Sequence, residues 1–193
     1  MPPKSKFTRE EIINAALEIV KRDGIDALTA RALGAELGCS ARPIFTVFRS
    51  IGDVRSEVER AARALYTDYV NEGLGEAVAF RGVGKAYIRF AAEHPKLFML
   101  LFMSENVRVP DSGSVLGIID GNADKILASI TDGYGLDEDA ARKIYIRLWI
   151  YSHGIATLIA TKVCAFTADE VSDMLTDVFV SLLGKYKKAC GEK

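Results

Sequence analysis

A glycine-containing turn between two short amphipathic segments, at residues 28–51, constrains the fold of this chain more than any other feature of its sequence. Thr29 has the side-chain oxygen that caps a helix N-terminus, and Leu33 and Leu37 would lie one turn apart on one face of the helix that follows. Gly38 tolerates a positive φ and can end that helix. We therefore predict a short helix from about Thr29 to Leu37, followed by a tight turn.

A second short helix is predicted directly after this turn. Ser40 can cap it, and Pro43 falls in its first turn, where the missing N–H costs no helical hydrogen bond. Ile44 and Phe48 are four residues apart and would face the first helix. The residues left facing outward, wholly or in part, are Ala41, Arg42, Pro43, Phe45, Thr46 and Val47.

Two short helices joined by a Gly-containing turn are typical of a helix-turn-helix, whose second helix reads base edges in the DNA major groove. An ordinary helical hairpin shows the same pattern, so the pattern alone leaves both interpretations open. The preceding residues favour the helix-turn-helix, because Thr8 and Glu11 form a capping box that opens an amphipathic helix ending near Gly24.

The segment from Thr8 to Val58 resembles, in the order and spacing of these motifs, the N-terminal DNA-binding domain of the TetR family of bacterial transcriptional regulators. The resemblance implies that the outward residues of the third helix contact the operator, and that two positions of the second helix add contacts. The DNA-contacting residues expected on this basis are Thr29, Arg31, Ser40, Ala41, Arg42, Pro43, Phe45, Thr46 and Arg49.

Two positions depart from the usual pattern of that family. Phe45 stands where a tyrosine hydroxyl usually meets a phosphate, and Ile51 stands where a lysine commonly meets the DNA backbone. Each change removes a phosphate contact, so we expect affinity to depend more on Arg42, on Arg49 and on the basic arm at residues 4–9. A simpler interpretation of that arm is a solvated N-terminus.

The overall composition neither requires nor excludes nucleic-acid binding. The 193 residues are 49% hydrophobic and 26% charged, with a formal net charge of −1, which is an ordinary balance for a globular protein. The two histidines are His94 and His153, and no HExxH, GxSxG or Cys/His set indicates a catalytic centre or a metal site. We therefore expect no enzyme activity, no cofactor and no metal.

The cysteines and the apolar segments predict a cytoplasmic protein. Cys39, Cys164 and Cys190 are widely spaced and form no CxxC pair, so we expect reduced thiols rather than disulfides or a zinc site. Cys39, in the turn, is either a redox-sensitive thiol or a small residue packed on the core. The most apolar stretch, residues 148–161, is too short to span a bilayer, so no membrane association is expected.

Segments with helical periodicity follow one another from residue 52 to the C-terminus, with a polar loop predicted at residues 106–114. No strand alternation or glycine-rich phosphate loop is present. One helix is expected to end at His94-Pro95, and a later one to run from about residue 115 to 132. The last two begin at Asp137 and at a capping box opened by Thr167. The chain is thus predicted to be all-α, with about nine helices.

The last two predicted helices are apolar enough to form either the core of this chain or half of a four-helix dimer interface. The family resemblance favours the dimer interface, since TetR-like proteins pair through these helices. We expect a DNA-binding domain over residues 1–51 and a helical effector-binding and dimerisation domain over residues 52–193. The partners would be a second copy of the chain and a palindromic operator in double-stranded DNA, with half-sites about 34–36 Å apart.

Trp149, His153 and Gly154, together with the run HPKLFMLLFM, resemble the signature of one C-terminal subclass of TetR-like regulators. His153 is more simply explained as a hydrogen-bonded residue of the core or of an interface than as a ligand contact. A pocket for a small, largely apolar effector is expected among residues that would each also suit a core, namely Tyr66, Tyr87, Phe90, Phe98, Phe102, Ile119, Trp149 and His153.

Two functions follow from these patterns. The first is a repressor that a bound effector releases from DNA. The alternative is a ligand-independent helix-turn-helix protein whose C-terminal domain serves only dimerisation. A cavity of roughly a few hundred Å³ in each subunit would favour the first, and a filled helical bundle the second.

Overall fold

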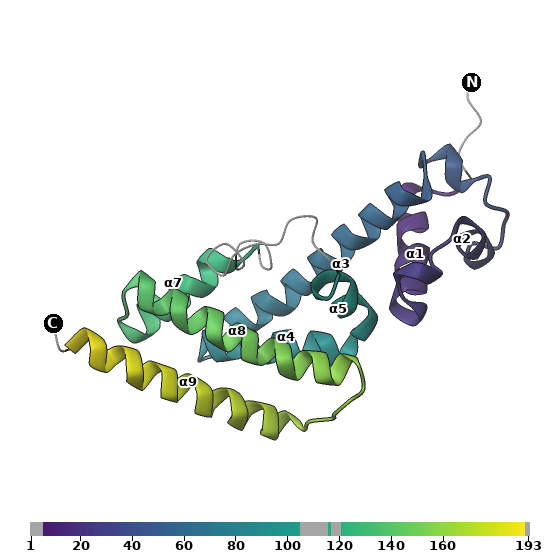
Figure 1. Ribbon diagram of the computed structural model, residues 1–193. Coiled ribbons are helices and arrows are strands. Elements are labelled where there is room, and N and C mark those ends of the chain that lie inside the picture. The colour runs from purple at the N-terminus through teal and green to yellow at the C-terminus, as the bar shows by residue number, and fades with distance from the viewer. Residues whose placement is uncertain (1–5, 105–115, 117–120, 192–193) are drawn as a thin grey trace. The chain divides into compact units, whose positions relative to one another are not determined.

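Figure 1 shows the computed structural model, which describes residues 6–104, 116 and 121–191, without the side chains of residues 188–191. The described residues form eight α-helices and two short 3-10 segments, and none of them lies in a strand. The predicted all-α class is therefore confirmed. Within the described residues, Cys39 and Cys164 are free thiols, no side-chain cluster suits a metal ion, and no helix is long and apolar enough to cross a membrane.

Residue contacts divide the chain into two units. The first comprises Met1–Leu65 with His94–Ser104, and the second comprises Tyr66–Glu93 with Glu105–Lys193. The division falls within helix α3 (Ile51–Leu74), whereas the sequence-based boundary lies at the start of this helix.

The first unit contains the helix-turn-helix segment and the helices around it. Its elements are α1 (Arg9–Asp23), η1 (Ile25–Ala27), α2 (Ala30–Glu36), η2 (Ile44–Thr46), the first part of α3, and α5 (Pro95–Phe102). The predicted caps are confirmed, because Thr8 and Glu11 form a reciprocal capping box and Thr29 Oγ1 accepts a hydrogen bond from the N–H of Ala32 at 3.1 Å. Its core includes Ile12, Ala16, Val20, Leu28, Leu33, Ile44, Phe48, Val54, Val58, Leu97 and Phe98.

The second helix of the predicted helix-turn-helix is wrong in length and type. In place of a short helix capped by Ser40, the structure has a single 3-10 turn, η2. Pro43 lacks an N–H and disfavours a helical conformation in the residue before it, so a helix does not begin at Ser40. The N–H and the hydroxyl of Thr46 both donate to the Pro43 carbonyl, at 3.2 and 2.7 Å, and close this turn.

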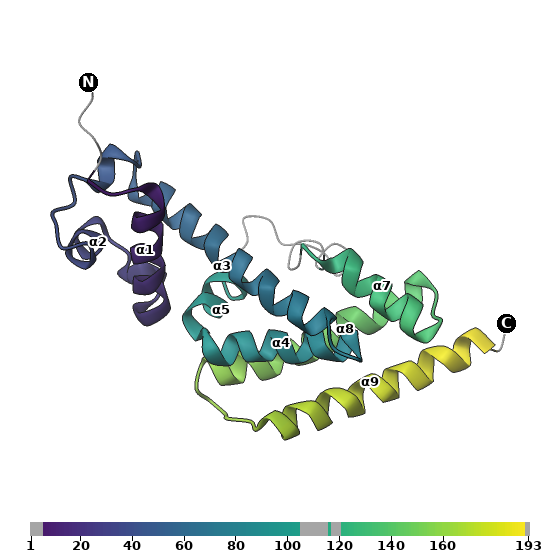
Figure 2. The ribbon, with the colours of Figure 1, turned by 180° about the vertical axis from the view of Figure 1, so that it is seen from behind.

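The second unit contains the last turns of α3, α4 (Ala79–Glu93), α7 (Ala123–Tyr134), α8 (Glu138–Ala160) and α9 (Ala168–Gly191). Helix α8 contacts α4, α7 and α9, and α9 runs beside α8 in both views (Figures 1 and 2). The predicted starts of α8 and α9 are confirmed by side-chain caps from Asp137 and Thr167. Helix α7 begins at Ala123 rather than near residue 115; Leu116 is also helical, and residues 117–120 lie outside the described part.

Two glycines set the distance between the end of α3 and the start of α4. A Cβ added to Gly73 would lie 2.6 Å from the carbonyl carbon of Gly82, and one added to Gly82 would lie 2.2 Å from the Gly73 oxygen. Neither position accommodates a side chain without moving the backbone of the other helix. The two helices therefore meet backbone to backbone at this point.

Candidate nucleic-acid interface and effector site

The residues expected to contact DNA lie in the first unit, from the start of α2 to the start of α3. Ala41 and Pro43 are half-buried at the turn, while the apolar residues of the same segment, Ile44 and Phe48, are buried in the core. The other predicted residues are exposed, namely Thr29, Arg31, Ser40, Arg42, Phe45, Thr46 and Arg49.

Three exposed arginines of this segment, Arg31, Arg42 and Arg49, make no ion pair with any residue that the structure describes. By contrast, Arg22 on α1 contacts the Glu36 carboxylate at 3.2 Å. A guanidinium group without an internal carboxylate is available to a phosphate or to the edge of a guanine base. The segment therefore presents three such groups at the surface.

Arg9, from the basic arm, is exposed but already contacts other residues of the first unit. Its Nη2 lies 2.6 Å from Glu57 Oε1, and its guanidinium carbon lies 4.5 Å from the centre of the Phe48 ring. The hydrogen bond from Arg9 also holds the pKa of the Glu57 carboxyl below its ordinary value. Lys6 of the arm is exposed, and Lys4 lies outside the described residues.

The uncharged residues of the segment limit the contacts that it can make. The Thr29 hydroxyl oxygen accepts the N–H of Ala32, which leaves its hydrogen for donation to a phosphate oxygen. The Thr46 hydroxyl hydrogen is already donated to the Pro43 carbonyl. Phe45 is 46% exposed and has no polar group, so it suits apolar contact such as that with a thymine methyl group.

Gly34 is a residue of this site that sequence reasoning missed. It is buried in α2, and a Cβ at this position would lie 2.9 Å from the Cys39 oxygen and 3.0 Å from the Ala41 nitrogen. The turn can therefore approach α2 closely only because Gly34 has no side chain. The available signal was a glycine inside a predicted helix, which often marks close packing.

The structure brings together four of the residues expected to line the effector pocket. Tyr66, Tyr87 and Trp149 line a gap of about 20 Å³, which has room for about one water molecule. The Tyr87 hydroxyl and His153 Nδ1 are hydrogen-bonded at 2.9 Å, and the Trp149 and His153 rings are stacked with centroids 5.2 Å apart. Burial lowers the pKa of His153, and the Trp149 indole N–H is buried without a hydrogen-bond partner among the residues that the structure describes.

The other predicted pocket residues are placed differently. Phe90 is fully buried, with its ring centroid 5.4 Å from that of Tyr66. Phe98 and Phe102 contact each other within the first unit, at 5.4 Å between ring centroids. Ile119 lies outside the described residues. The pocket set is therefore divided between the two contact units.

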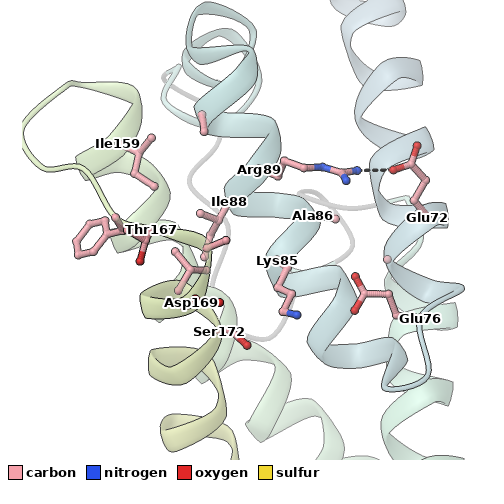
Figure 3. A pocket seen from close by; sticks show the side chains of 15 residues that line it. Glu72, Glu76, Lys85, Ala86, Ile88, Arg89, Ile159, Thr167, Asp169 and Ser172 are labelled. Carbon is pink, nitrogen blue, oxygen red and sulfur yellow. Dashed lines mark hydrogen bonds and ion pairs between the residues drawn. The ribbon is translucent and has the colours of Figure 1, made fainter.

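A larger cavity lies elsewhere in the second unit and involves none of the predicted pocket residues. Its volume is about 560 Å³, and it is lined by the end of α3, by α4, by Ile159 of α8 and by residues at the start of α9 (Figure 3). Lys85 and Arg89 of α4 both line it. Two cations four residues apart on a predicted helix were the sequence signal for this site.

Two comparisons with known proteins identify similar sequences. Residues 80–183 match the family model described as tetracyclin repressor-like, C-terminal domain. Over 165 residues, the chain is 29% identical to an uncharacterized HTH-type transcriptional regulator of Mycobacterium tuberculosis, an alignment that covers 82% of this chain and 73% of that protein. Proteins of this family are DNA-binding transcriptional regulators rather than enzymes, and they dimerise. Since the family model spans more than half of its residues, the chain belongs to the tetracyclin repressor-like (TetR) family of transcriptional regulators.

Proposed function

We propose that this regulator is a repressor that binds a palindromic operator as a homodimer and is released by a small, largely apolar effector. The observation that carries the proposal is the exposed segment from Thr29 to Arg49, in which three arginines lack any described ion-pair partner. Phosphate contacts would supply most of the affinity, and base contacts the sequence preference. Arg42, in the turn before η2, is our candidate for a base contact, with Arg31 and Arg49 on phosphates.

The proposal of a homodimer rests on an apolar row left uncovered on α8 and α9. Ile150 and Leu158 of α8 are 59% and 37% exposed, and Val180 of α9 is 58% exposed. Gly154 lies between the first two, and a Cβ added to it or to Gly184 would meet nothing within 4 Å. An apolar row with space at two glycines suits a helix of a second copy, and a two-fold pairing would use the same surface on both chains.

The proposal of effector release concerns the cluster of Tyr66, Tyr87, Trp149 and His153. Its gap of about 20 Å³ is too small for most ligands, so an effector must bind a conformation in which these aromatic rings have separated. Such a ligand favours the opened conformation by its differential affinity, which is the requirement for releasing DNA. The indole N–H of Trp149, which has no hydrogen-bond partner in the described part of the chain, would donate the hydrogen bond that orients the effector.

The closed cluster also supports the alternative of a ligand-independent regulator. In that case the rings are simply core, and the second unit serves only dimerisation. Titration of aromatic compounds against the protein separates the two. Thermal stabilisation together with operator release supports an effector-controlled repressor, whereas neither effect with any compound supports the alternative.

The DNA-binding part of the proposal is tested by selecting bound sequences from a random pool of double-stranded DNA. We expect enrichment of a palindrome whose half-sites are about one helical turn apart. Enrichment of a single, unrepeated site would contradict the homodimer, and no enrichment would contradict sequence-specific binding.

A further inference from the structure

The cavity of about 560 Å³ shares no lining residue with the gap between the aromatic rings of Tyr66, Tyr87 and Trp149. Its volume lies within the range of about 300–1,000 Å³ that is usual for small-molecule sites. All of its lining residues belong to the second unit, so its shape does not depend on the first. It is therefore a separate candidate binding site.

The floor and sides of this cavity are largely apolar. Ile88 is 3% exposed and Val171 is 7% exposed, so the aliphatic surface that they contribute is well packed from behind. The apolar side chains that line the cavity include Ala86, Ile88, Ala92, Ile159, Phe166 and Val171. A ligand that fits here needs an apolar portion to cover them.

One ion pair at the cavity is already complete. Arg89 of α4 binds the carboxylate of Glu72 of α3, and its guanidinium carbon lies 4.7 Å from the centre of the Tyr69 ring (Figure 3). The hydrogen bond to Glu72 raises the pKa of Arg89. Because these two charges neutralise each other, neither needs an oppositely charged group from a ligand.

A second pair of opposite charges at the cavity is not joined. Lys85 lies one turn before Arg89 on α4 and is half-buried, and Glu76 follows the end of α3. Figure 3 shows the Glu76 carboxylate turned toward the wall that carries Lys85. Neither side chain makes an ion pair or hydrogen bond with any described residue. The cavity thus presents the unpaired ammonium group of Lys85 and, turned toward the wall that carries it, the unpaired carboxylate of Glu76.

We propose that this cavity binds a small zwitterion with an apolar side group, which is the chemistry of a free apolar amino acid. The ligand carboxylate would contact Lys85, its ammonium group Glu76, and its side group the apolar floor. A simple carboxylic acid fits less well, because Glu76 and the exposed Asp169 would repel it. A simple amine would leave the half-buried ammonium of Lys85 without a partner.

An occupant of this cavity would also touch α3, because Glu72 and Gly73 form part of the wall. Helix α3 carries residues of both contact units, so binding here reaches the helix that begins beside the DNA-contacting segment. The binding itself does not depend on the proposed function, and it can be measured without DNA.

The test is calorimetric titration of the full chain, without DNA, with three matched compounds. They are L-phenylalanine, N-acetyl-L-phenylalanine, which lacks the ammonium group, and L-phenylalaninamide, which lacks the carboxylate. We expect L-phenylalanine to bind at least about tenfold more tightly than either derivative, because each derivative loses one hydrogen bond between charged groups.

Single substitutions assign each ligand charge to its residue. In Lys85→Met, L-phenylalanine and its amide should bind equally, and in Glu76→Gln, L-phenylalanine and its N-acetyl derivative should bind equally. Lys125→Met removes an exposed lysine on α7 and should leave the affinities of all three compounds unchanged. Ala92→Phe fills the cavity without altering a charge and should abolish binding, with thermal unfolding used to confirm that each variant is folded.

Three results would overturn the proposal. They are no binding of L-phenylalanine at millimolar concentration, a derivative that binds as tightly as the zwitterion, and an unchanged preference for the carboxylate in folded Lys85→Met. A failure of operator binding with intact amino-acid binding would contradict the proposed function and leave this site in place.

Discussion

The helix-turn-helix segment of the first unit and helix α8 of the second differ in the partners of their exposed cations. On α8, Arg142 contacts Glu138 at 3.0 Å and Lys143 pairs with Asp139, so each cation is satisfied one turn away on its own helix. In the helix-turn-helix segment, Arg31, Arg42 and Arg49 have no such partner among the described residues. The difference separates cations that support their own helix from cations that are available to another molecule.

The units also differ in the apolar surface that they leave uncovered. In the first unit, two large apolar side chains are clearly exposed among the described residues: Phe45, within the segment expected to meet DNA, and Met103, directly after α5. In the second unit, Ile150, Leu158 and Val180 form an exposed row on two adjacent helices. We infer that each unit keeps its exposed groups for a different partner, and the following variants test that division in order of expected effect.

The largest effect is expected from Ile150→Glu. A carboxylate in the apolar row on α8 should prevent pairing of two chains, and loss of the second helix-turn-helix segment should weaken operator binding about 10²–10⁴-fold. Sedimentation velocity and fluorescence anisotropy on the selected operator measure the two consequences. Ala128→Glu, on the exposed face of α7, is the matched control. A dimeric Ile150→Glu with unchanged affinity would show that this row is not the interface.

Arg42→Ala should reduce discrimination between the selected operator and a single-base variant by about 1–3 kcal/mol, if Arg42 contacts a base edge. The measurement is the difference in binding free energy for the two DNA sequences. Arg142→Ala removes a paired arginine of the second unit and should leave this difference unchanged. An equal loss of affinity for both sequences would reassign Arg42 to a phosphate.

Gly34→Ala should lower the free energy of unfolding by about 1–3 kcal/mol, because the new methyl group would press on the backbone of Cys39 and Ala41. Gly133→Ala, in α7, meets nothing within 4 Å and should instead stabilise by about 0.5–1 kcal/mol. Urea titrations of both variants provide the comparison. Equal effects of the two substitutions would mean that the turn does not depend on close approach to α2.

A smaller effect is expected from pH through His153. Burial lowers its pKa from the ordinary value of 6.5, so the folded protein binds fewer protons than the unfolded chain as pH falls. The stability due to neutral His153 is present above pH 6.5 and is lost as pH falls through the lowered pKa. Melting temperature should therefore decline less on acidification in His153→Gln than in the parent protein. Equal declines of melting temperature in the two proteins would show that His153 does not contribute to the pH dependence of stability.

Local features of this fold were predictable from sequence because they depend on neighbouring residues. The caps at Thr8, Thr29, Asp137 and Thr167 all begin helices where expected, since a cap needs only a suitable oxygen and the next few N–H groups. The second helix of the helix-turn-helix was wrong because the conformational restraint from Pro43 outweighed the apolar spacing of the segment.

The effector site was less predictable because it depends on packing between distant helices. Phe90 and Phe98 look alike in sequence, yet they are buried in different contact units. The larger cavity is lined by Lys85, Glu76 and Gly73, and Gly73 is one of the two glycines at which α3 and α4 meet closely. Helical periodicity places Lys85 and Arg89 on one face of α4, but it does not show that α3 lies close enough to form a cavity with them.

The salt dependence of operator binding tests most directly whether the unpaired arginines contact DNA. Arg31→Ala combined with Arg49→Ala should reduce the slope of log affinity against log salt by about 3–4 for a homodimer, because two phosphate contacts are lost in each subunit. Arg63→Ala combined with Arg142→Ala removes two paired arginines and should leave the slope unchanged. Equal slopes for the two double variants would contradict the account.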